Sequence, residues 1–144
     1  MKCCYSLISI GFFVALCATA GAQTTVSNLE IPVIDRPPVL ADFSGMEPST
    51  EIREKMVMVE NFIQRVPDNG ENASQKTEAY LAYDNRNIYA IFLAFDEEPE
   101  LVRANLSPRE NVEDDDTVSI LIDTFNDQRT GYAFRSTPLG VQWD

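Results

Sequence analysis

The stretch TEAYLAYDNRNIYAIFLAFDEEP, residues 77–99, decides the fold of this chain. It contains two runs rich in tyrosine, leucine, isoleucine and phenylalanine, separated by the turn-forming residues DNRN (84–87). Two β-favouring runs on either side of a four-residue loop predict an antiparallel hairpin. The second run is apolar or aromatic at every position from Ile88 to Phe95. We therefore expect its strand to be central and buried on both faces.

A second hairpin is predicted closer to the end of the chain. TVSILID (117–123) and GYAFRST (131–137) have the composition of strands, and TFNDQRTG (124–131) supplies the turn between them. A separate strand is predicted over KMVMVENFIQRVP (55–67), where side chains alternate until Pro67. These segments together indicate a protein made mainly of short strands.

The remaining segments are expected to be irregular or to lie at an edge. IPVIDRPPVLADF (31–43) carries three prolines, which allow an extended edge segment but exclude a central strand. SGMEPSTEI (44–52) is expected to be a loop, and LVRANL (101–106) a short strand or a helical turn. No amphipathic helix is evident. Six or seven short strands with turn signals between them predict an all-β antiparallel β-sandwich.

Residues 1–22 have the pattern of a secretory signal peptide. Lys2 precedes the apolar stretch YSLISIGFFVAL (5–16), and the small residues AGA (20–22) precede Gln23. A membrane anchor is the alternative, but the apolar run is short for a bilayer span. A lipoprotein anchor at Cys17 is disfavoured because Leu16 stands where a small residue is needed. Residues 23–31 are then a flexible lead-in, and the predicted domain covers 32–144.

Cleavage after Ala22 would remove Cys3, Cys4 and Cys17, which are all the cysteines, and the chain has no histidine. Ser-His-Asp and Cys-His catalysis and cysteine-based zinc sites are thereby excluded. Of the 11 basic residues only Lys2 is lost, so 10 basic residues face 23 acidic ones, a net charge of −13. Nucleic acid is a poor partner for such a domain. An exported acidic domain without disulfides fits a bacterial periplasm or cell surface.

Acidic residues at both ends of the 117–123 strand suggest a calcium site. Calcium takes six to eight oxygen ligands, and Asp123 and Asp127 lie at the same end of the second hairpin. Asp116 lies at the other end, about 20 Å away at ~3.3 Å per residue, and the order of residues matches no EF-hand loop. The alternative is a solvated rim whose aspartates cap turns. Nothing marks a carboxylate pair for glycoside hydrolysis, so we expect no enzyme in this chain.

Three other residues are candidates for ligand binding. Gln64 and Arg65 place an amide and a planar guanidinium before a turn, a combination that suits hydroxyl or carboxylate recognition. Their alternative role is an arginine–carboxylate pair on the acidic surface. Trp143 is the only tryptophan of the chain and the candidate aromatic platform for a sugar. Its alternative role is ordinary packing.

Several motifs carry a resemblance to a known family. They are TEAYLAYD (77–84), RANLSPRE (103–110), DDTVSILIDTFNDQR (115–129) and GVQWD (140–144). This combination is similar to the family 9 carbohydrate-binding-module-like domain. It resembles the version at the N-terminus of long exported bacterial proteins with an uncharacterised β-barrel-like C-terminal region. The usual entry motif is replaced by IDRPPVLADF (34–43), with Phe43 at its aromatic position, and the paired tryptophans that clamp sugar have no match.

The resemblance implies a jelly-roll-like sandwich that continues past Asp144. It also implies a non-catalytic, carbohydrate-associated role in the periplasm or outer membrane, linked to carbohydrate catabolism. Any glycosyl hydrolase activity would belong to the rest of the parent protein. The expected partners are a polysaccharide or oligosaccharide and the downstream domain of the same protein. Two alternatives are a docking domain that packs on the downstream barrel without binding sugar, and a calcium-stabilised module without a soluble ligand.

Overall fold

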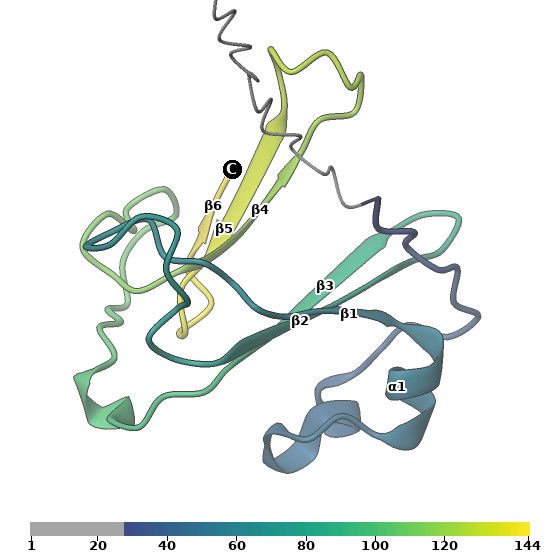
Figure 1. Cartoon of the computed structure of the whole chain (residues 1–144), viewed down its shortest axis with the longest axis horizontal. Helices are drawn as coiled ribbons and strands as arrows, with labels where there is room; N and C mark the ends of the chain where they lie inside the picture. The colour runs from purple at the N-terminus through teal and green to yellow at the C-terminus, as the bar shows by residue number, and fades with distance from the viewer. Residues whose placement is uncertain (1–27) are drawn as a thin grey trace, which may run out of the picture.

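A computed structural model of the chain describes residues 28–144 (Figure 1). The expected signal peptide and the first part of the lead-in lie outside this range. Six strands form two antiparallel three-stranded sheets, with the orders β1-β2-β3 and β4-β5-β6. The predicted all-β class is confirmed, whereas the face-to-face packing of a sandwich stays a prediction. Over residues 28–144, no helix has the length and apolar character needed to cross a membrane.

The first sheet contains the predicted hairpin, formed by β2 (Thr77–Tyr83) and β3 (Ile88–Ala94). Its turn is organised by Asp84, whose Oδ1 accepts the backbone N–H groups of Arg86 and Asn87, both at 2.7 Å. An aspartate that accepts main-chain donors two and three residues later replaces backbone hydrogen bonds in a turn. The hairpin expected from residues 77–99 is thus confirmed.

The expected central position of the second hairpin strand is wrong, because β3 lies at an edge of its sheet. The central strand is β2, which pairs with β3 on one side and with β1 (Val57–Val59) on the other. Four of the seven β2 residues are buried, compared with one in β3. Apolar residues on both faces of a strand predict that its side chains are buried, but they do not predict which strands lie next to each other.

Two expectations for residues 44–67 are also corrected. The predicted strand over 55–67 is limited to β1, and the predicted loop over 44–52 contains the end of η1 (Leu40–Met46) and the start of α1 (Thr50–Lys55). The Ser49 hydroxyl accepts the Ile52 N–H at 3.5 Å and caps α1. Ile52 is the only buried residue of this six-residue helix, so no helical repeat marked it in the sequence. A short η2 (Pro99–Leu101) follows the first sheet.

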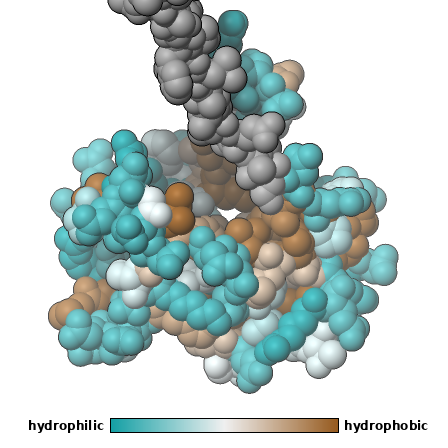
Figure 2. All heavy atoms as spheres, in the orientation of Figure 1, coloured by the Kyte–Doolittle hydropathy of each residue, from teal (hydrophilic) through white to brown (hydrophobic). Residues whose placement is uncertain are grey.

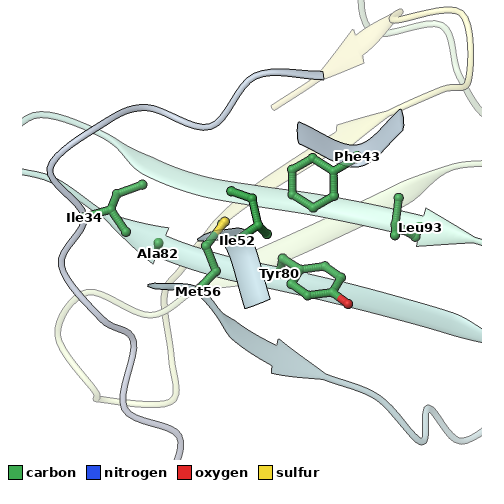
Figure 3. Packing of buried hydrophobic residues seen from close by; sticks show 7 residues of the cluster. All are labelled: Ile34, Phe43, Ile52, Met56, Tyr80, Ala82 and Leu93. Carbon is green, nitrogen blue, oxygen red and sulfur yellow. The ribbon is translucent and has the colours of Figure 1, made fainter. Parts of the chain in front are cut away.

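The core covers one face of the first sheet, as Figure 3 shows. Side chains from η1 and α1 lie against β2 and β3, and the rings of Phe43 and Tyr80 meet edge to face at 5.6 Å. The extended edge segment expected over 31–43 is found only at its start, where the Ile34 N–H donates to the Tyr83 carbonyl at 2.9 Å, whereas residues 40–43 lie in η1. The buried cluster consists of Ile34, Phe43, Ile52, Met56, Tyr80, Ala82 and Leu93.

The second sheet contains the other predicted hairpin, formed by β4 (Val118–Ile122) and β5 (Tyr132–Ser136), together with β6 (Gln142–Trp143). In Figure 1 the β4–β5 hairpin extends away from the first sheet. The segment 103–116, which precedes β4, is held together by two acidic residues. Asp116 accepts the Arg103 N–H at 2.8 Å, and Asp115 accepts the Asn105 side-chain amide at 2.7 Å.

Candidate functional site

A cleft of about 710 Å³ lies between β3 and the second sheet, and we call it the inter-sheet cleft. On the β3 side it is lined by Ile88, Ala90 and Phe92. Side chains alternate along a strand, and the neighbouring residues Tyr89 and Ile91 pack against the core. The core therefore covers one face of β3, and the cleft borders the other.

The opposite wall of the inter-sheet cleft is also apolar. Val118, Ile120 and Ile122 of β4 line it, together with Phe134, which is paired directly with Ile120. Other residues cover these apolar walls only in part, because Ile88 is 55 % exposed and Phe134 is 45 % exposed. On the face of the molecule drawn in Figure 2, hydrophobic residues surround a hollow near the centre.

Polar groups gather at the β5–β6 end of the cleft. The lining there includes Ser136, Gln142, Asp144 and Arg109. The Arg109 guanidinium is hydrogen-bonded to the Asp144 carboxylate and contacts Glu110 at 3.3 Å. The Asp144 carboxylate, followed by that of Glu110, raises the pKa of Arg109 above its usual value. Apolar walls with polar groups at one end are typical of small-molecule sites.

A tight turn places β6 beside β5. The Gly140 N–H donates to the Thr137 carbonyl at 2.9 Å, and the Val141 N–H donates to Thr137 Oγ1 at 3.1 Å. Gly140 has φ of 80°, a left-handed conformation that favours glycine. Thr137 and Val141 are both buried. This turn fixes the register in which Trp143 stands opposite Arg135.

Arg135 and Trp143 form a stacked pair. The guanidinium carbon of Arg135 lies 5.0 Å from the centroid of the Trp143 ring. Directly paired residues on neighbouring strands project on the same face, so the two side chains share one face of the sheet. Ser136 and Gln142 are the next pair along the two strands. Residues of both pairs line the inter-sheet cleft, so the aromatic–cationic pair and the polar groups border the same end of it.

The other two predicted ligand residues lie elsewhere. The Gln64 N–H donates to the Glu71 carbonyl at 2.9 Å, and the Gly70 N–H donates to the Gln64 carbonyl at 3.0 Å. Gln64 and Arg65 thus belong to a small loop, and neither lines the inter-sheet cleft. The structure does not bring them together with Trp143 in that cleft. A ligand role for Gln64 and Arg65 stays a prediction.

The two predicted calcium ligands organise the turn between β4 and β5. Asp123 accepts the N–H groups of Gln128 at 2.8 Å and Phe125 at 3.1 Å, and these bonds lower the pKa of Asp123. Asp127 accepts the N–H of Arg129 at 2.9 Å and has a lowered pKa for the same reason. Across the described part of the chain, no three carboxylates or other metal-binding side chains gather around one point. The calcium site stays a prediction.

A second hollow, of about 610 Å³, lies on the core side of the first sheet. Glu78 is buried there, and its carboxylate contacts Lys76 at 2.6 Å and accepts the Tyr80 hydroxyl at 2.8 Å. The pKa of Glu78 is lowered, first by Lys76 and then by Tyr80. Burial, together with the Glu78 carboxylate, raises the pKa of Tyr80 to about 12. Each Glu78 oxygen has a partner in or next to β2, so this network satisfies the buried carboxylate within the strand.

Sequence reasoning identified Trp143 but missed the residues around it. Arg109, Arg135 and Gln142 come from separate parts of the chain, and no spacing links them. One signal was available, since Arg135 is the only charged residue of GYAFRST (131–137). An arginine within the predicted 131–137 strand therefore required an explanation.

No protein-family model matches the chain, and no match is found among curated proteins or solved structures. The resemblance to the family 9 carbohydrate-binding-module-like domain accordingly stays a prediction.

Proposed function

We propose that this chain is a non-catalytic carbohydrate-binding-type domain of an exported bacterial envelope protein. It binds a polysaccharide or oligosaccharide at the β5–β6 end of the inter-sheet cleft. The family resemblance suggests this role, and the absence of histidine removes the commonest general base. The domain would hold a glycan for the rest of the parent protein, in the periplasm or at the cell surface.

The inter-sheet cleft is the observation that carries this proposal. Its walls are apolar, its polar groups gather at one end, and the only tryptophan of the chain lies in the strand that forms this end. Apolar surface contacts the faces of sugar rings, while a few fixed donors and acceptors orient the hydroxyl groups. Gln142 supplies both a donor and an acceptor, and Ser136 supplies a hydroxyl.

Intrinsic fluorescence tests the proposal directly, because every tryptophan signal comes from Trp143. Titration with β-glucan, xylan and peptidoglycan fragments is expected to change the emission, and calorimetry gives the affinity. Gln142→Ala should weaken binding by roughly fivefold to tenfold, as expected for loss of one hydrogen-bonding group. The matched control is Gln64→Ala, which changes the same residue type outside the cleft. Binding neither to these glycans nor to an acidic oligosaccharide would overturn the proposal.

A docking role is the second candidate, and the exposure of Ile88 and Phe134 favours it. Apolar strand residues left half-covered are a common feature of protein interfaces. In this case the downstream domain of the parent protein would fill the inter-sheet cleft in place of a sugar. Ile88→Glu distinguishes the two. It should abolish association with the separately produced downstream domain if docking is the role, and a docking domain would show no glycan titration.

A further inference from the structure

We propose that the stacked pair Arg135–Trp143 is a receptor for the carboxylate of an acidic saccharide, so that the glycan recognised contains uronic acid residues. This inference rests on the proposed function and names the ligand class of the same sheet end. Four observations carry it: the lack of a carboxylate partner for Arg135, its partial burial, its stacking on Trp143, and the charge of its surroundings.

Arg135 has no ion-pair partner within residues 28–144. Six of the ten basic residues in that range contact an aspartate or glutamate. The four that do not are Arg65, Arg86, Arg129 and Arg135.

Burial separates Arg135 from the other three. Arg65, Arg86 and Arg129 are exposed, so water satisfies their N–H groups, whereas Arg135 is half-buried. A guanidinium that is partly removed from water loses solvation, and a carboxylate ligand is the group that best replaces it. No guanidinium N–H of Arg135 donates a hydrogen bond to another described residue, so these groups remain available to a ligand.

Trp143 gives this guanidinium a fixed orientation. At 5.0 Å from the ring centroid, the cation is attracted by the negative face of the indole. A planar guanidinium stacked on a ring keeps its N–H edges free, and these edges match the two oxygens of a carboxylate. The tryptophan is thus expected to orient the arginine rather than to stack alone under a sugar ring.

The surroundings of the pair favour an anion over a cation. The residues directly paired with Arg135 are Ser119 on β4 and Trp143 on β6, both uncharged. At physiological ionic strength the Debye length is about 8 Å, so exposed acidic residues elsewhere on the molecule are largely screened. Among the residues that line the cleft, Arg86, Arg109 and Arg135 are basic and only Asp144 is acidic, so the charge of the lining is positive.

The test compares tri-galacturonate with its methyl ester, in which each charged carboxylate is replaced by a neutral ester group. With the intact protein at physiological ionic strength, the acid should bind more tightly than the ester by about tenfold to a hundredfold, as expected for charge-assisted hydrogen bonds. Arg135→Gln should remove this preference while leaving the affinity for the ester within about twofold. Arg135→Lys keeps the charge but loses the planar fork, so it should restore only part of the preference.

Arg129→Gln is the matched control, because it makes the same change of charge at an exposed arginine without a carboxylate partner in the described range. It should keep the preference for the acid. Equal binding of acid and ester by the unmodified protein would overturn the inference and leave the proposed function standing. Binding of neither ligand, nor of any neutral glycan, would overturn both. The comparison on unmodified protein stays decisive even if Arg135→Gln fails to fold.

Discussion

Asp84 shows how a single carboxylate can determine a hairpin. It accepts the N–H groups of Arg86 and Asn87 and the hydroxyl of Tyr89, the last at 2.7 Å. The Arg86 N–H, the Tyr89 hydroxyl and the Asn87 N–H together lower the pKa of Asp84 to about 2, from 3.8. All of these donors favour the ionised form, so the turn depends on charge at this position.

The lowered pKa predicts a loss of stability in acid. A carboxylate whose pKa is depressed in the folded state binds fewer protons in the native than in the unfolded chain. Its contribution to the free energy of unfolding is therefore present above pH 3.8 and is lost as pH falls toward 2. Asp84→Asn should therefore lower the melting temperature at pH 7, and its deficit should shrink between pH 4 and pH 2. Circular dichroism melts measure this, with Asp68→Asn in an exposed loop as the control. A deficit that is constant with pH would contradict the assignment.

Among the elements, the turn between β5 and β6 depends on one glycine. Gly140 has φ of 80°, and an added Cβ would meet no atom within 4 Å, so only backbone conformation opposes substitution. Gly140→Ala should cost about 1–2 kcal/mol, the penalty of a left-handed conformation for a residue with a side chain. Gly140→Asn should cost less, because asparagine tolerates that region. Urea unfolding measures both losses, and equal losses in the two variants would contradict a cost set by the left-handed conformation.

The two hairpins could be predicted because their signals are local. Alternation and turn chemistry lie within some twenty residues, and the Asp84 turn needs nothing outside the 84–89 segment. The edge position of β3 could not be predicted, because it depends on where β1, some thirty residues earlier in the chain, pairs. The helix α1 was missed for a different reason: one N-cap serine and one buried isoleucine give no periodic pattern.

The candidate site lies at the scale of the whole molecule, and for this reason only part of it was predictable. Trp143 stood out as the only tryptophan, but its partner Arg135 is set by strand register. Arg109 reaches Asp144 from a segment that precedes the entire second sheet. Such convergence follows from the course of the chain in three dimensions, which the spacing of motifs does not record. The functional proposals above therefore depend on tertiary structure more than the fold class does.

Charge acts on the whole molecule as well, and it predicts how salt affects stability. A net charge of −12 makes the compact state repel itself, so adding NaCl should raise the melting temperature. In a domain of this size, each ~1 kcal/mol of screening corresponds to roughly 4 °C.

At equal ionic strength CaCl₂ should act like NaCl, because Asp123 and Asp127 already accept main-chain N–H groups. A larger rise with calcium that is reversed by chelator and abolished by Asp127→Asn would instead establish the predicted calcium site. The matched control is Asp114→Asn, which removes one charge from the acidic run at the other end of β4 and should leave the calcium response unchanged.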